Sequence, residues 1–127
     1  MAGPLVFPIG GIDDGGPLDS VGIVAIAPEE GRCELGYWLA REGRGRGAAT
    51  RSVLLLSHWI FENLDIHRIV VCPEPANGAS RAVAVRAGFS EDGLLRSYLV
   101  IKGRRRDVAS YVLLCGEISR WSRSSGA

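Results

Sequence analysis

The sequence predicts an α+β domain whose mixed, mostly antiparallel sheet contains a central β-loop-α-β crossover. Three observations support this class: apolar alternation with period two at both ends of the chain, one long amphipathic segment in the middle, and a glycine-rich loop directly before it. The 127 residues are 46% hydrophobic and 23% charged, which supplies enough apolar material for one core. We therefore expect a single domain over residues 1–118 and a flexible tail over 119–127.

The first half of the chain predicts three strands, at residues 5–9, 21–27 and 33–39. A loop of glycine, aspartate and proline separates the first two, and a turn at 29–31 makes the last two an antiparallel hairpin. Alternation within the third strand places Glu34 and Trp38 on the face opposite to Leu35. One face of this strand is therefore apolar, and the other carries a carboxylate.

The second half predicts two helices, at residues 48–63 and 78–87, and three strands, at 69–72, 94–101 and 108–115. In the first helix, Leu55 and Trp59 join an apolar stripe with three- and four-residue spacing. Asn77 can cap the second helix, and Gly88 supplies a left-handed end. Residues 102–107 predict a basic hairpin tip between the last two strands. The crossover through the first helix makes the strands on either side of it parallel neighbours.

Cysteine usage and hydropathy indicate the cellular compartment of the protein. The three cysteines, Cys33, Cys72 and Cys115, form no CxxC pair and have no histidine at zinc-ligand spacing. We therefore expect the three cysteines to be buried in the core as small hydrophobic side chains of a protein in a reducing compartment, and we expect no bound metal. No stretch approaches the roughly 20 apolar residues of a membrane-spanning helix, and residues 1–10 lack the pattern of a signal peptide. These features predict a cytoplasmic protein with no membrane partner.

The net charge of +1 hides an uneven distribution. The first 30 residues carry five acidic groups and no basic one, so the other 97 hold 15 basic and 9 acidic groups, a net charge of +6. A modestly basic body favours a ligand with several phosphates over a long nucleic acid. Aromatic residues do not alternate with the arginines as a single-stranded RNA site requires, so we expect no nucleic-acid partner.

The loop at residues 41–47 runs from the third strand directly into the first helix, and it holds three glycines and three arginines. Glycines let the backbone approach a ligand closely. The first amides of a helix lack internal partners, and the helix dipole adds partial positive charge there. This arrangement predicts a pyrophosphate site, although it matches neither the Walker loop nor the dinucleotide fingerprint.

The RxxGxA pattern of Arg44 to Ala49, after the run ELGYWL of residues 34–39, resembles the acetyl-CoA pyrophosphate loop of the GNAT superfamily of N-acetyltransferases. Downstream, the segments NGAS (77–80) and AGF (87–89) are similar to the branch that acetylates the N-termini of ribosomal proteins, including the ribosomal-protein-alanine type. The resemblance extends over residues 20–115. It implies the acyl-CoA N-acyltransferase fold in an N-terminally shortened form.

The resemblance also implies that acetyl-CoA is the co-substrate and that separate stretches of the chain bind its parts. The backbone around Trp38, Leu39 and Ala40 would hold the pantetheine arm. Asn77 and Ser80 would lie near the distal part of this arm and the thioester, although Asn77 also serves as an ordinary helix cap. The residues implied for the pyrophosphate are Arg44, Gly45, Arg46, Gly47, Ala48 and Ala49.

The catalysis implied by the resemblance is direct attack of a primary amine on the thioester carbonyl, with an amide donor near Leu39 or Ala40 for the oxyanion. Glu34 is the first candidate for the base that takes the ammonium proton, and an ordinary ion pair is its alternative role. Ser80 is the candidate acid, or hydrogen-bond donor, for the leaving thiolate.

Some groups used by other family members are missing from this sequence. The tyrosine acid of many members falls at Ala84, and a late-strand carboxylate of some members falls near Leu99. Tyr98 and Tyr111 are spare candidates for the acid, with structural roles as their alternatives. Family members also carry a first strand and two helices, which form much of the acceptor wall, before the segment that begins here. Three explanations stay open: a start codon assigned too late, completion as a homodimer, or loss of the acceptor site.

Two hypotheses from different classes follow from the sequence. The first is an N-acetyltransferase that uses acetyl-CoA to modify an amine acceptor, either a protein N-terminus or a small amine. The alternative is a catalytically inactive fragment of the same fold that still binds coenzyme A. The sequence alone leaves open the identity of the acceptor, the identity of the base and the oligomeric state.

Overall fold

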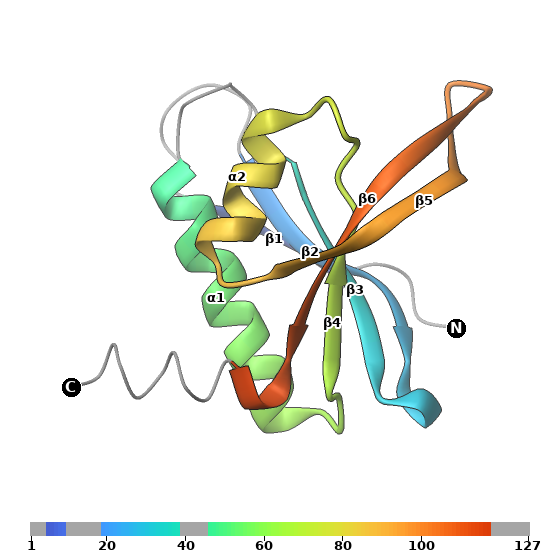
Figure 1. Ribbon diagram of the computed structural model, residues 1–127. Helices are drawn as coiled ribbons and strands as arrows, with labels where there is room; N and C mark the ends of the chain where they lie inside the picture. The colour runs from blue at the N-terminus through green and yellow to red at the C-terminus, as the bar shows by residue number, and fades with distance from the viewer. Residues whose placement is uncertain (1–4, 10–18, 39–45, 118–127) are drawn as a thin grey trace.

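The structure is a computed structural model that describes residues 5–9, 19–38 and 46–117 (Figure 1). Within these residues, six strands form one mixed sheet in the order β1-β2-β3-β4-β6-β5. The strands are β1 (Leu5–Ile9), β2 (Asp19–Ala27), β3 (Arg32–Trp38), β4 (Arg68–Val71), β5 (Ser90–Ile101) and β6 (Arg104–Leu114). The helices are α1 (Arg46–Asn63) and α2 (Gly78–Arg86). The predicted α+β class is confirmed, while the predicted tail at 119–127 lies outside the described residues.

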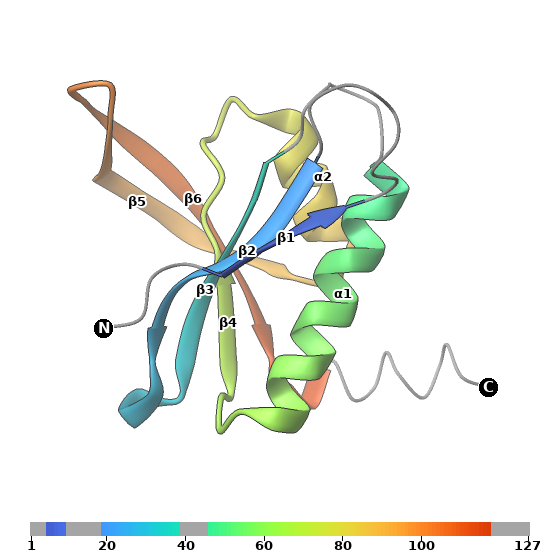
Figure 2. The ribbon, with the colours of Figure 1, turned by 180° about the vertical axis from the view of Figure 1, so that it is seen from behind.

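The two helices cover the same side of the sheet, as the opposite views in Figure 1 and Figure 2 both show. β2 and β3 are antiparallel and are joined by a 3₁₀ turn at Pro28–Glu30, which ends at Gly31 with a φ of 69°. β3 and β4 are parallel. Because a parallel pair requires a crossover, the segment that contains α1 provides it, as the sequence predicted.

The hydrophobic core lies between the helices and the sheet. α1 contributes Ala49, Val53 and Ile60, and all three are fully buried. β3 and β4 contribute Leu35 and Ile69 from the sheet. Burying a side chain as large as leucine or isoleucine stabilises the fold by about 1.5–3 kcal/mol. The burial of Ala49 in the first turn of α1 fixes where this helix begins relative to the sheet.

Two predicted core residues of α1 are instead exposed. Leu55 and Trp59 have 59% and 51% of their surface exposed, so their assignment to the apolar stripe was wrong. Ser57 occupies the buried face between Val53 and Ile60. Four consecutive apolar residues, 53–56, cover most of a helical turn, so spacing alone does not tell which of them face the core.

The hairpin formed by β5 and β6 is longer than the sequence predicted. β5 begins at Ser90 and β6 begins at Arg104, and only Lys102 and Gly103 remain between the strands, both with positive φ. The added residues, 90–93 and 104–107, are exposed. They therefore lack the apolar alternation by which a half-buried strand is recognised.

Both predicted ends of α2 are confirmed. The Asn77 side chain accepts a hydrogen bond from the Ser80 N–H at 3.1 Å, which caps the first turn. At the other end, Gly88 has a φ of 89°, and the Phe89 N–H donates to the Ala84 carbonyl oxygen at 3.0 Å. Phe89 is buried against the core. These two caps fix the length of α2 and hold its first turn in place.

We expect Gly88→Ala to lower the free energy of unfolding by about 1–2 kcal/mol, because a side chain disfavours positive φ. The nearest neighbour of an added Cβ is Leu113 Cδ1 at 4.0 Å, so crowding does not contribute. Gly78→Ala is the matched control, since it adds a methyl group to the first turn of α2 where nothing lies within 4 Å. Urea unfolding followed by circular dichroism measures both variants, and equal stability would contradict the expectation.

Candidate active site

The parallel strands β3 and β4 separate after four residue pairs. Pairing ends at Leu35 and Val71, and β3 then continues to Trp38. The chain after Val71 instead stays against β6, where the Ala109 N–H donates to the Pro73 carbonyl oxygen at 2.8 Å. Within the described residues, the last three residues of β3 therefore have no strand partner on the side that faces away from β2.

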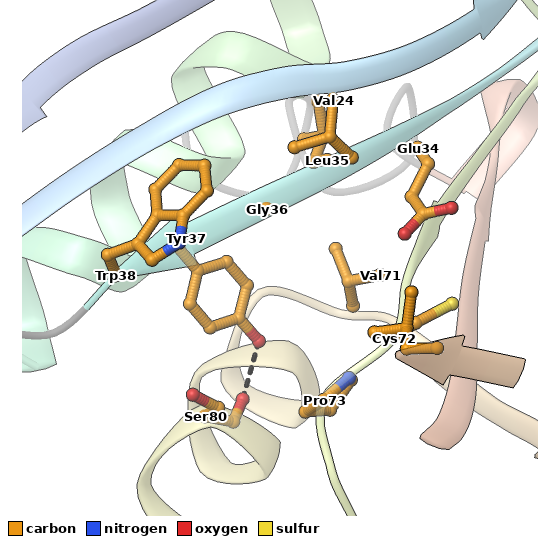
Figure 3. Close-up of a pocket in the computed structure, with 11 residues that line it drawn as sticks. Val24, Glu34, Leu35, Gly36, Tyr37, Trp38, Val71, Cys72, Pro73 and Ser80 are labelled. Atoms are coloured by element: carbon orange, nitrogen blue, oxygen red, sulfur yellow. Dashed lines mark hydrogen bonds between the residues drawn. The ribbon is translucent and has the colours of Figure 1, made fainter. Parts of the chain in front are cut away.

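The separation leaves a cleft of about 290 Å³ between β3, the end of β4 and the first turn of α2 (Figure 3). Its walls include the predicted site residues Glu34, Trp38 and Ser80. The Tyr37 phenol donates a hydrogen bond to the Ser80 carbonyl oxygen at 2.5 Å, and this bond ties β3 to α2 across the cleft (Figure 3). The fold thus brings two residues of β3 and one residue of α2, more than 40 positions later in the sequence, to one cavity.

Glu34 faces this cleft from the side of the sheet opposite to the helices. Burial raises the pKa of its carboxyl group above the ordinary value, and hydrogen bonding from the Tyr98 phenol opposes part of this shift. Cys72 lies next to Glu34 (Figure 3), and burial together with the charge of Glu34 raises the pKa of the Cys72 thiol to about 12. A carboxylate with a raised pKa is suited to accept a proton near neutral pH.

A second hollow, of about 450 Å³, opens beside the cleft at the start of α2. Tyr37, Trp38 and Ser80 line both cavities, and Asn77 lines the second one. The Asn77 side chain is engaged as the helix cap, while Ser80 is buried where the two cavities meet. An extended ligand therefore has space to run from the cleft past Ser80 to the N-terminal end of α2.

The predicted anion site falls only partly within the described residues. Arg44 and Gly45 of this site lie outside them, as do Leu39 and Ala40, which were predicted for the pantetheine arm. α1 begins at Arg46, two residues earlier than the sequence predicted, so Gly47 and Ala48 lie in its first turn. Among the described residues, nothing lies within 4 Å of a Cβ added at Gly47. Ala49 is fully buried, and its side chain packs in the hydrophobic core.

Other residues of the cleft were not given a role by the sequence. Cys72 was expected in the core, yet it is partly exposed and lines the cleft. The signal that could have identified it is its place directly after β4, because ligands often bind at the carboxyl ends of parallel strands. Two positions where other family members carry a catalytic group have none here: Ala84 is fully buried, and Leu99 adds only an apolar side chain to the cleft.

None of the helices in the described ranges is long and apolar enough to cross a membrane. The same ranges contain no group of three or more His, Cys, Asp or Glu side chains arranged to hold a metal ion. All three cysteines are free, and Cys33 is buried as expected.

Comparison with known proteins identifies the family. Residues 6–90 match the sequence profile described as the acetyltransferase (GNAT) domain, and this match covers more than half of the chain. The chain therefore belongs to the GNAT acetyltransferase family, as the loop and its downstream motifs indicated.

The chain is similar in sequence to several proteins whose names refer to ribosomal proteins. YdaF of Bacillus subtilis, which is named for ribosomal N-acetyltransferase activity, is 39% identical over 83 residues, covering 65% of this chain and 45% of YdaF. The ribosomal protein uS5-alanine N-acetyltransferase of Escherichia coli is 31% identical over 75 residues, covering 59% of this chain and 39% of that protein. The chain thus spans about half the length of the curated relatives it matches, or less.

Solved structures share the fold. Mycobacterium smegmatis RimJ, solved in complex with CoA-disulfide, has a TM-score of 0.76 and 28% identity, covering 97% of this chain and 60% of RimJ. RimL, a ribosomal alpha-N-protein acetyltransferase solved in complex with coenzyme A, has a TM-score of 0.65 and 30% identity, covering 76% of this chain and 54% of RimL. The acyl-CoA N-acyltransferase fold implied by the sequence is confirmed.

We expect Cys72 to react slowly with iodoacetamide at about pH 8, because only the thiolate reacts and the pKa of this thiol is raised to about 12. Its thiolate fraction is then roughly 10³-fold smaller than that of a free cysteine. Mass spectrometry of the alkylated peptide measures the rate, and Cys72→Ala verifies the peptide assignment. Glu34→Gln should increase the rate, since the negative charge that opposes the thiolate is removed. Labelling as fast as that of glutathione would contradict the expectation.

Proposed function

We propose that this chain forms the catalytic part of an N-acetyltransferase that moves an acetyl group from acetyl-CoA to a primary amine. The observation that carries the proposal is the cleft at the separation of β3 and β4, with Glu34 on its wall, in a chain of the GNAT family. We propose the N-terminal amine of a protein as the acceptor, because several relatives are named for ribosomal proteins. A small amine is the alternative acceptor.

The thioester donor would be held largely by backbone groups. A strand edge without a partner can bind an extended chain that carries amides, as if that chain were an added strand. The last three residues of β3 provide such an edge, and Asn77 and Ser80 lie further along the same path. The amides of residues 45–49, together with the Arg44 guanidinium, would bind the diphosphate at the start of α1.

The chemistry that we propose is direct attack of the amine nitrogen on the carbonyl carbon of the thioester. Glu34 takes a proton from the ammonium form, directly or through a water molecule, which frees the nitrogen lone pair. The C–N bond forms and the C–S bond breaks, and the nitrogen passes its second proton through water to the sulfur that leaves, so the products are the amide and the free thiol. The Ser80 hydroxyl donates a hydrogen bond to this sulfur as it leaves. Holding the two reactants in register supplies a large part of the acceleration.

A second candidate is a unit that binds coenzyme A without turnover. The observation that favours it concerns the side of the sheet that carries Glu34. In the part of the chain that the structure describes, both helices cover the other side, and Val24, Trp38 and Leu99 are exposed. Few of the described residues would therefore enclose an acceptor that binds on the Glu34 side.

Two measurements separate the candidates. Isothermal titration calorimetry with coenzyme A detects binding, and release of free thiol from acetyl-CoA in the presence of small amines and N-terminal peptides detects turnover. An acetyltransferase gives both signals, whereas a binding unit gives only the first. Absence of both signals would contradict the proposed function.

We expect Gly47→Glu to abolish binding of coenzyme A, because it brings a carboxylate to the first turn of α1 where the diphosphate would lie. Gly47→Ala is the matched control, since no described residue lies within 4 Å of the added Cβ, and its affinity should stay within a few fold of the wild type. Calorimetry measures both affinities. Unchanged binding by Gly47→Glu would show that the diphosphate does not lie at the start of α1.

We expect Glu34→Gln to lower kcat by about 10²–10⁴-fold and to leave the affinity for coenzyme A nearly unchanged, because the base acts on the acceptor. A general base works in its deprotonated form. Since the pKa of Glu34 is raised, kcat/KM of the wild type should increase with pH through a midpoint above that of an ordinary glutamate. Turnover of Glu34→Gln at the full rate would exclude Glu34 as the base.

A further inference from the structure

β5 contains a bulge opposite β6. The two strands are paired up to Leu95 and again from Leu99, so the three residues Arg96 to Tyr98 face the single residue Asp107. Bulges redirect side chains and occur often beside active sites. This bulge lies on a strand that passes close to the candidate active site, since Leu99 lines its cleft.

The centre of the bulge is held in an unfavourable conformation. Ser97 has a φ of 57°, in the left-handed region that residues with a side chain disfavour. Its N–H donates to Asp107 Oδ1 at 2.8 Å, and Arg105 Nη1 donates to its carbonyl oxygen at 2.9 Å. Hydrogen bonds to two side chains of β6 therefore replace the backbone pairing at Ser97 and stabilise the bulge.

The bulge presents Tyr98 on the side of the sheet that carries Glu34. The two side chains line a groove of about 230 Å³ together with Ala25 and Val70, and the negative charge of the Glu34 carboxylate raises the pKa of the Tyr98 phenol, as expected for neighbouring groups. Glu34 also lines the cleft between β3 and β4, so it lies where groove and cleft meet. Burial does not explain the placement of Tyr98, because 48% of its surface is exposed.

We propose that Tyr98 is a positioning residue: its phenol fixes the Glu34 carboxylate at the junction of groove and cleft, and the Arg96–Tyr98 bulge holds the phenol there. This inference rests on the proposed function, in which Glu34 is the base. Within the described residues, the other titratable groups around Glu34 are Arg32 and Cys33 on β3 and Cys72 after β4. The facing residues of β2, such as Ala25, carry no charge.

Tyr98→Phe removes the hydroxyl group and keeps the ring. A donor to the charged carboxylate favours its ionised form, so its loss should raise the pKa of Glu34 and move the acid limb of the kcat/KM profile by about one unit to higher pH. At a pH below both midpoints this is about a tenfold loss of kcat/KM. The affinity for coenzyme A should not change.

Tyr111→Phe is the matched control for the loss of a tyrosine hydroxyl. Tyr111 is buried and its hydroxyl accepts a hydrogen bond from Arg81 Nε, so its removal should affect stability and leave the acid limb in place. A second pair of variants tests the bulge. Asp107→Ala removes the acceptor of the Ser97 N–H and should move the acid limb in the same direction as Tyr98→Phe. Asp107→Asn retains an acceptor oxygen and should restore the wild-type profile.

Carbon-13 NMR titration of the glutamate carboxyl groups, with Glu34 assigned through Glu34→Gln, follows the same pKa without turnover. The inference requires that the midpoint of Glu34 rises in Tyr98→Phe and that the acid limb moves with it. A midpoint that does not move, or an acid limb that stays in place in an active Tyr98→Phe enzyme, would overturn it. A wild-type protein that releases no thiol with any amine contradicts the proposed function first, and this inference with it.

Discussion

The constraint on which the candidate site depends is the unequal length of two neighbouring parallel strands. β4 has only four residues, since the chain after Val71 contains Pro73 and Pro75 and turns toward α2. β3 continues for three more residues because β2 pairs with it along its whole length. One edge of β3 is therefore open at its end, and the cleft forms there. The Tyr37–Ser80 hydrogen bond keeps α2 at the far side of the opening.

The two faces of the sheet have different roles: one packs in the core, and the other carries the candidate base. Leu35 and Val71, the last pair before the cleft, are fully buried under the helices. Their sequence neighbours Glu34 and Cys72 point to the other side, where the cleft leaves them partly exposed. Partial burial is what raises the pKa of both groups, so the geometry that opens the cleft also tunes the candidate base.

Much of the fold could be predicted from the sequence because local signals determine it. Alternation in β3, the Asn77 cap and the left-handed Gly88 are each encoded by a few adjacent residues, and all three are confirmed. The outward orientation of Trp59 in α1 could not be predicted, because several apolar residues around the helix compete for the core. The first four residues of β5 and of β6 were missed for the opposite reason, since they have no apolar face.

The candidate site could likewise be predicted only in part. The position of Glu34 on β3 follows from a sequence motif, whereas the placement of Tyr98 on the same groove as Glu34 depends on a bulge in another strand. A bulge adds unpaired residues to one strand, and the local sequence pattern does not predict them. Here the bulge contains a serine with positive φ, which is stabilised by side chains from β6. Long-range pairing of this kind becomes visible only when the strands are placed side by side.

Amide hydrogen exchange measured by NMR, with and without coenzyme A, tests most directly whether the open edge of β3 binds the donor. We expect coenzyme A to slow exchange at those amides among the last three residues of β3 that point away from β2, and at the first turn of α1. The amides between β2 and β3 should exchange as before, since they are already paired. Saturating coenzyme A that leaves the open-edge amides at their free exchange rate would contradict the central claim.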